Sequence, residues 1–281
     1  MEGGALRGLF TAAVLDVFLE HGIQLDAACG VSAGVSFGVN YPSKQRGRAL
    51  RYCVRFRRDP RFCSIPSLLL TGDMYGGKFC YHTLPNVLDP YDREAFKETN
   101  IPFYIVCTDC ETGKAVYKQI KTFDETELEW IRAGASMPLA AKIVHVGGRA
   151  MLDGGLVDSI PLRFMQHKGY ERNVVILTQP VGYRKPPNPL MPMMHKAYAK
   201  YPNLIRAAAR RHIIYNHQLE YVENARLEGD VFVIRPPMTL PISRVSHSKT
   251  KMQEVYRIGR QTALSALPAL KEFLEKNGKT I

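Results

Sequence analysis

Hydrophobic residues follow two patterns along this chain, one typical of strands and one typical of helices, and the two take turns along the sequence. Short, continuous apolar runs are typical of buried strands, and they occur at 27–31, 101–109, 174–180 and 230–236, with a strand of alternating pattern at 114–120. Apolar positions at helical spacing predict helices at 9–20, 44–58, 125–135, 193–227 and 249–276. Because strands and helices alternate, we predict an α/β fold in which helices cover both faces of a mainly parallel sheet.

A long segment without regular apolar spacing and two strongly basic runs stand out from this alternation of strands and helices. Residues 60–90 combine prolines, glycines and aromatic residues, which predicts a long ordered loop with a short helix. The predicted helix at 44–58 is strongly basic, and a second basic run follows at 204–211. A solvated cationic helix face explains both runs most simply, and docking on an anionic membrane is the alternative.

Composition favours one globular domain over residues 1–281, with the motifs described below in 2–180 and a helical C-terminal part at 190–281. A hydrophobic content of 46% over 281 residues excludes a disordered polymer. The 38 Lys and Arg residues exceed the 26 Asp and Glu residues and give a formal charge of +12, so the surface attracts anions. No apolar run approaches the roughly 18 residues that a membrane-spanning helix requires.

The six cysteines favour a reducing compartment, because the chain opens without a signal-peptide pattern. We therefore expect a cytoplasmic location, from which the protein can contact the inner membrane face peripherally. Cys107 and Cys110 form a C-x-x-C pair, which suits either a redox pair or half of a zinc site. No second pair completes a tetrahedral set, so we expect no metal and no cofactor.

Ser32 carries the candidate chemistry. It lies between Gly30 and Gly34, directly after a predicted buried strand and before small, helix-compatible residues. This G-x-S-x-G pattern is typical of a nucleophile elbow, a sharp strand-to-helix turn that exposes a serine hydroxyl. The alternative is a tight turn in which the serine only caps a helix.

Two further elements supply what a serine nucleophile needs. The stretch EGGALRG at 2–8 opens the first predicted helix, where backbone N–H groups can stabilise an oxyanion or bind a phosphate. Asp153 precedes Gly154 and Gly155 at the end of an apolar run. Its carboxylate can accept the serine proton if the two side chains meet, or it can merely hold a turn.

Taken together, these elements resemble the patatin-like phospholipase family. The resemblance covers most of residues 2–180 and includes the glycine-rich loop, the elbow, the ASMP stretch at 135–138 and the D-G-G at 153–155, in the family's order. It implies a three-layer α/β/α fold with a mainly parallel central sheet, and lipid acyl hydrolysis by a serine–aspartate dyad. Ser32 would be the nucleophile and Asp153 the general base, and the oxyanion hole would come from the loop residues Gly3, Gly4, Ala5, Arg7 and Gly8.

The chain departs from the family pattern in two places. Ala5 stands where the family has a third glycine, and a methyl group fits there if φ is negative. The family also has a strand before the loop, so we expect Met1 to be the last residue of such a strand, with the native start upstream.

Our leading hypothesis is a phospholipase or esterase that works through an acyl-enzyme intermediate, with a lipid or acyl ester as substrate. The alternatives are a soluble esterase or thioesterase acting on non-phospholipid acyl groups, and a non-catalytic lipid-binding protein. His145 is the rival general base. Nucleic acid is not an expected partner, since no binding module accompanies the charge, and the sequence leaves the oligomeric state open.

Overall fold

We describe a computed structural model of residues 1–275 of the chain. Its strands are β1 (Ala28–Gly30), β2 (Phe103–Asp109), β3 (Ala115–Ile120), β4 (Val144–Val146), β5 (Arg149–Asp153), β6 (Asn173–Ile176) and β7 (Val231–Ile234). Its helices are α1 (Leu9–Glu20), α2 (Ala33–Gly38), α3 (Arg48–Phe56), α4 (Ile65–Thr71), α5 (Arg93–Thr99), α6 (Glu125–Gly134), α7 (Leu162–His167), α8 (Met191–Ala197), α9 (Pro202–Glu228) and α10 (Lys249–Glu275). Short turns of 3₁₀ helix, η1 (Ala5–Gly8) and η3 (Gly154–Leu156), and one π-helix, η2 (Phe79–Leu88), complete the set.

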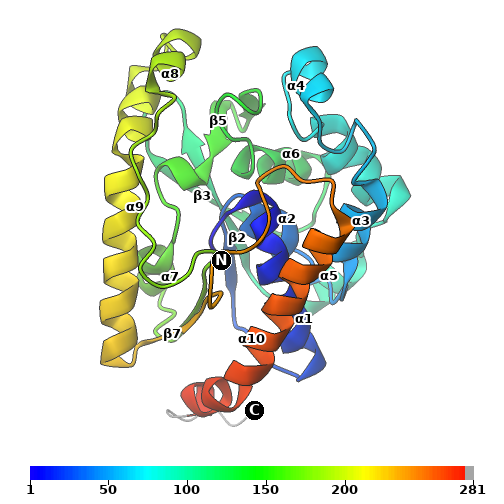
Figure 1. Ribbon diagram of the computed structural model, residues 1–281, viewed down its shortest axis with the longest axis vertical. Coiled ribbons are helices and arrows are strands. Elements are labelled where there is room, and N and C mark those ends of the chain that lie inside the picture. Colours follow the sequence, from blue (N-terminus) through cyan, green and yellow to red (C-terminus); the bar gives the residue numbers. More distant parts are fainter. Residues whose placement is uncertain (276–281) are drawn as a thin grey trace.

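The α/β class is confirmed, and helices lie on both sides of the strands. In Figure 1, α7 and α9 lie on one side, and α1, α3 and α10 lie on the other. The main hydrophobic core forms between α1, α3, α10 and the sheet, and further clusters form beneath α9. The predicted strand at 174–180 ends earlier than expected, at Ile176, and residue 276 of the last predicted helix lies outside the described residues.

The strands form two sheets, a mixed one of β1 to β5 and a parallel pair of β6 and β7, so only part of the strand pairing is parallel as predicted. β1 pairs with β2 in parallel, and β6 pairs with β7 in parallel. By contrast, β3, β4 and β5 all join their neighbours in antiparallel register. The connections β2–β3 and β4–β5 are tight turns, and a tight turn can only join antiparallel strands.

The backbone of Met1 and Glu2 lies between β1 and β6. The amino group of Met1 donates to Cys29 O at 2.8 Å, and the Val31 N–H donates to Met1 O at 3.2 Å, which is the pattern of a parallel pair. On the other side, the Glu2 N–H donates to Ile176 O at 3.0 Å. Met1 thus runs along β1 as a strand would, but the bonding continues through Glu2, one residue beyond the predicted strand end, and neither residue belongs to a strand.

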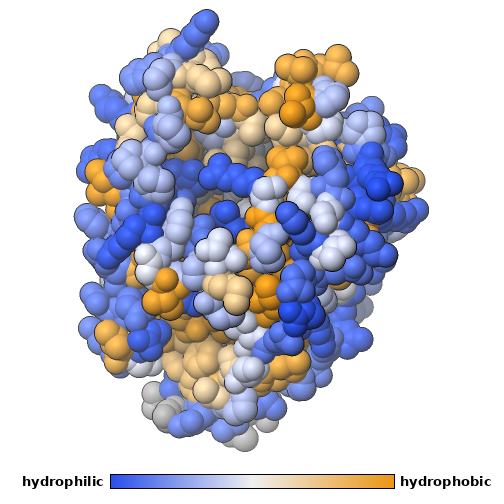
Figure 2. Space-filling model, in the orientation of Figure 1, coloured by the Kyte–Doolittle hydropathy of each residue, from blue (hydrophilic) through white to orange (hydrophobic). Residues whose placement is uncertain are grey.

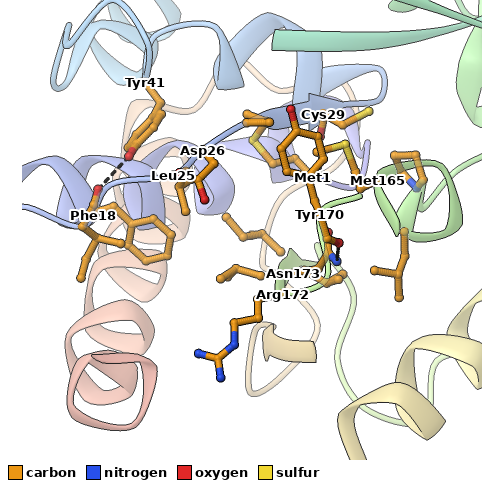
Figure 3. Close-up of a pocket in the computed structure, with 18 of the residues that line it drawn as sticks. Met1, Phe18, Leu25, Asp26, Cys29, Tyr41, Met165, Tyr170, Arg172 and Asn173 are labelled. Atoms are coloured by element: carbon orange, nitrogen blue, oxygen red, sulfur yellow. Dashed lines mark hydrogen bonds between the residues drawn. The ribbon is translucent and has the colours of Figure 1, made fainter. Parts of the chain in front are cut away.

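A cavity of about 590 Å³ lies next to Met1, between β1 and β6. Figure 3 shows residues that line it, among them Tyr41, Met165 and Tyr170. Neither Ser32 nor Asp153 is among its lining residues, so this cavity is separate from the candidate site described below.

The region 60–90 holds more helix than the sequence predicted. Besides α4, it contains the π-helix η2, which includes Pro85. The proline and the scattered aromatic residues concealed this helix, because they interrupt the apolar spacing that identifies an α-helix.

Three cations of the basic stretch at 44–58 bind groups of the protein itself. Arg48 is buried, and it forms an ion pair with Asp89 at 3.1 Å. Arg51 pairs with the same carboxylate at 2.8 Å, and Arg55 donates to Leu88 O. These side chains fasten α3 to the end of η2, which does not support the hypothesis that they bind lipid. Within residues 1–275, none of the helices combines the length and apolarity that a bilayer crossing requires.

The packing of α10 on α1 makes a first prediction. A Cβ at Gly259 would lie 2.6 Å from Phe10 O and 2.8 Å from Ala13 Cβ, so Gly259→Ala must push the two helices apart. We expect this substitution to lower the free energy of unfolding by about 1–3 kcal/mol, measured by urea denaturation. Ser265→Ala, on the exposed face of α10, is the control and should change it by less than about 0.5 kcal/mol. Equal stability of the two variants would contradict the close packing.

Candidate active site

Ser32 lies in the turn between β1 and α2. Its backbone has φ 55° and ψ −121°, a conformation that costs a residue with a side chain about 1–3 kcal/mol. The turn is so tight that a Cβ at Gly30 would lie 2.3 Å from Gly34 O. The geometry is that of the nucleophile elbow the sequence indicated, with Ser32 lining a cavity.

The glycine-rich loop packs directly on this serine. A Cβ at Gly3 would lie 2.6 Å from Ser32 Cβ and 3.4 Å from its Oγ, so only glycine allows this approach. Within residues 1–275, the N–H groups of Gly3 and Gly4 have no hydrogen-bond partner. The N–H of Arg7, by contrast, donates to Gly4 O at 3.1 Å and is engaged within the loop. Of the N–H groups predicted for the oxyanion hole, those of Gly3, Gly4 and Ala5 are therefore the ones without a partner among the described residues.

Ala5 corrects one expectation. The φ of Ala5 is +50°, not negative. A residue with a side chain adopts this left-handed backbone conformation at a cost of about 1–2 kcal/mol in stability. Gly8, at the end of η1, packs against Phe37 and Ala33 of α2.

Glu2 anchors the loop, a role that the sequence did not signal. Its side chain is 4% exposed. One carboxylate oxygen accepts the N–H of Thr178 and the other accepts the hydroxyl of Tyr215, both at 2.6 Å. The Thr178 hydroxyl in turn donates to Gly3 O at 2.9 Å. The loop position thus depends on residues that follow β6 and on α9.

Asp153 ends β5 and is completely buried. Its Oδ1 accepts the Gly155 N–H at 2.7 Å, whereas its buried Oδ2 has no hydrogen-bond partner. Burial raises the pKa of Asp153, while the Ser32 hydroxyl, the Gly155 N–H and then the Arg211 charge oppose that rise. The structure therefore brings Ser32 and Asp153 together, although 121 positions separate them (153 − 32).

The cavity at Ser32 has a volume of about 430 Å³. Apolar side chains form much of its wall, including Phe37, Met74, Leu84, Leu128, Ile131 and Met137. None of the eight histidines of the chain lines it, and His145 is exposed on β4. An apolar chain could occupy this space with one end at the serine.

The C-x-x-C pair serves packing. Cys107 and Cys110 are both fully buried free thiols, and they belong to different hydrophobic clusters. Burial raises the pKa of both thiols and so keeps them protonated. Among residues 1–275 there is no cluster of three or more side chains arranged to hold a metal ion.

Comparison with known proteins identifies two regions. Residues 1–165 match the family of patatin-like phospholipases, and residues 201–275 match a domain of unknown function, DUF6363. Escherichia coli strain K12 has a relative, the uncharacterized protein YjjU, that is 24% identical over 266 residues, or 92% of this chain and 73% of YjjU.

Two fungal lysophospholipases are also similar. The NTE1 protein of Candida glabrata is 23% identical over 97% of this chain, and that of Eremothecium gossypii is 24% identical over 99%. The matching regions make up only 16% and 18% of those two proteins, so this chain spans less than a fifth of their length.

The buried carboxylate predicts a gain of stability when its charge is removed. Because the pKa of Asp153 is raised, the native state binds this proton more tightly than the unfolded chain does. The cost in folding stability of ionising Asp153 is absent below the pKa that this residue has in the unfolded chain. The cost grows as pH rises, and it is complete above the pKa of Asp153 in the native protein. Asp153→Asn should therefore raise Tm by at least about 2 °C near pH 8, with a smaller gain near pH 4.

Asp124→Asn is the control in these thermal melts. Hydrogen bonds from the Glu127 N–H and the Thr122 hydroxyl lower the pKa of the Asp124 carboxylate, so its neutralisation should bring no gain near pH 8. A Tm for Asp153→Asn that stays at or below wild type at every pH would contradict the burial argument.

Proposed function

Because the chain belongs to the patatin-like phospholipase family, we propose that it hydrolyses acyl esters of lipids with Ser32 as nucleophile and Asp153 as general base. The observation that carries this proposal is that Oδ2 of Asp153 is buried without a hydrogen-bond partner. The Ser32 hydroxyl is close enough to lower the pKa of this carboxyl group. A carboxylate with one free oxygen and a raised pKa suits a base that must take and return a proton near neutral pH. The similarity to lysophospholipases agrees with this substrate class.

The reaction would proceed in two steps. Ser32 Oγ attacks the ester carbonyl carbon while Asp153 takes its proton, and the N–H groups of Gly3 and Gly4 stabilise the oxyanion. The C–O bond to the alcohol then breaks, and Asp153 returns the proton to the departing oxygen. Water attacks the acyl-serine, Asp153 takes the proton of the water, and Ser32 leaves with that proton as the acid is released.

The apolar cavity favours a lipid over a small ester. Its volume of about 430 Å³ is large enough for much of an acyl chain, and its wall offers that chain hydrophobic contact. A soluble esterase or thioesterase would share the same dyad, and a non-catalytic lipid-binding protein would share the cavity. Hydrolysis of p-nitrophenyl esters of graded chain length, measured beside phospholipid vesicles, separates these three functions.

Substitution of the dyad gives the direct test. Ser32→Ala should lower kcat/KM at least about 10³-fold and abolish labelling by a fluorophosphonate probe. Asp153→Asn should lower kcat/KM about 10²- to 10⁴-fold because the amide cannot accept the proton. His145→Ala, outside the cavity, is the control and should retain wild-type activity. Full activity of Asp153→Asn together with loss in His145→Ala would assign the base to the histidine instead.

We also propose that the enzyme docks on anionic membranes from a cytoplasmic location, with the cavity facing the lipid. Ile65, Leu69 and Leu70 of α4 are 64%, 79% and 86% exposed, and Leu190 and Met193 at α8 are 47% and 55% exposed. Figure 1 has α4 and α8 at the same end of the molecule, and Figure 2 has hydrophobic side chains gathered over both, with a recess between them. Leu190 and Met74, which follows α4, both line the cavity. The formal charge of +12 suits an anionic surface, and the free thiols suit a reducing compartment.

Exposed leucines allow this docking to be tested without disturbing the core. The double variant Leu69→Ser/Leu70→Ser should lower activity on anionic vesicles, relative to activity on a monomeric ester, at least about tenfold, since each buried leucine contributes about 1.5–3 kcal/mol. Leu227→Ser is the matched control, because Leu227 is 71% exposed near the far end of α9. An unchanged ratio in the double variant would remove α4 from the proposed contact.

A further inference from the structure

Four cations lie in the cavity of Ser32 without a carboxylate partner. Among the described residues, no carboxylate comes within ion-pair distance of Arg7, Lys185, Arg211 or Arg244. The other two arginines that line this cavity are paired, Arg48 with Asp89 and Arg132 with Asp73, each at 3.1 Å. The absence of a carboxylate partner is therefore confined to the part of the cavity that holds Arg7, Lys185, Arg211 and Arg244.

The protein holds these cations in place with neutral groups. Arg211, on α9, donates from Nε to Gly155 O at 2.6 Å. The Lys185 ammonium lies 4.2 Å from the centre of the Tyr215 ring. The Nε of Arg7 is buried and has no hydrogen-bond partner. Arg244 lies on the connection between β7 and α10, which Figure 1 shows passing in front of α2.

The cations act on one another. Burial, and next the charge of Arg211, lower the pKa of Lys185 to about 8, with Arg244 and Arg7 adding to the effect and Glu2 opposing it. Glu2 acts on Lys185 and Asp153 acts on Arg211, but neither carboxylate forms an ion pair with a cation of this cluster. Such an excess of positive charge in a partly buried place is costly, and a bound anion would offset the cost.

We propose that Arg7, Lys185, Arg211 and Arg244 bind a phosphate group of the substrate beside the reacting ester. This proposal rests on the proposed function and names its substrate class, an ester that carries a phosphate close to the acyl group. Three arginines and a lysine suit the several acceptor oxygens of a phosphate, which arginine contacts in a bidentate manner. Because Ser32 lines the same cavity, one molecule can meet the serine with its ester and the cations with its phosphate.

The proposal also gives the C-terminal region a role. Arg211 and Arg244 both belong to residues 201–275, which match the domain of unknown function, and Lys185 precedes it. Only Arg7 comes from the patatin-like region. The C-terminal region would then set the substrate preference of a site whose dyad lies elsewhere in the chain.

A matched pair of substrates tests the preference. We compare dihexanoyl phosphatidic acid with dihexanoylglycerol as monomers, since the two differ only in the phosphate. The ratio of their kcat/KM values should fall about 10- to 100-fold in Lys185→Gln/Arg244→Gln, as expected for the loss of charged hydrogen bonds. Arg184→Gln is the control, because the neighbouring Arg184 pairs with Glu220 at 2.8 Å, and it should leave the ratio unchanged. An unchanged ratio in the double variant overturns the proposal.

Binding to the inactive Ser32→Ala protein separates this proposal from the proposed function. Glycerol 3-phosphate should raise the Tm of this protein, and adding Lys185→Gln/Arg244→Gln should remove the rise. If wild type hydrolyses neither ester but this binding persists, the hydrolase fails and the phosphate site stands. If glycerol 3-phosphate does not bind, the phosphate site is overturned. Inorganic phosphate could also raise Tm as much as glycerol 3-phosphate does while wild type shows no preference for the phosphorylated ester. That outcome would assign the site to free phosphate and overturn the substrate assignment.

Discussion

The junction that Met1 and Glu2 form between the two sheets is the constraint on which the site depends. The backbone of these residues bonds to β1 on one side and to β6 on the other, and the Glu2 carboxylate bonds to Thr178 and Tyr215. The next residue, Gly3, is the one that packs on Ser32. A displacement of this segment would therefore move the loop away from the nucleophile and also separate α9, with Arg211, from the sheet that carries Asp153.

The parts of the site that local geometry dictates could be predicted from the sequence. Ser32 was identifiable because a tight strand-to-helix turn needs small residues around it, and α1 because its apolar spacing is unbroken. Glu2 and Arg211 were not identifiable, because their roles arise from contacts with residues 176 and 56 positions away in the chain. The antiparallel strands β4 and β5 were missed for a related reason: their pairing is set by a two-glycine turn and by tertiary partners, and their apolar runs are too short to identify alone.

The net charge and the basic runs of the sequence did not indicate which cations lack a carboxylate partner in the folded protein. The basic stretch at 44–58 has the pattern of a solvated surface helix, yet the buried Arg48 and the exposed Arg51 both pair with the buried carboxylate of Asp89. The cations without a carboxylate partner in the cavity are scattered over η1, a loop, α9 and a second loop, and of the four only Arg211 falls in one of the basic runs, at 204–211. Composition records how many charges a chain has, but only the fold decides which of them are neutralised within the protein and which stay free to meet a ligand.

The unfavourable features of this protein gather around Ser32. Ser32 and Ala5 both have positive φ, the Oδ2 of Asp153 is buried without a partner, and unpaired cations stand nearby. Each of these costs stability, and none improves the packing of the core. The hydrophobic core that includes α1 and α10 can offset the cost. Strain and uncompensated charge in one cavity are what a catalytic and binding site requires, because an empty site of this kind gains more from its substrate than a relaxed one would.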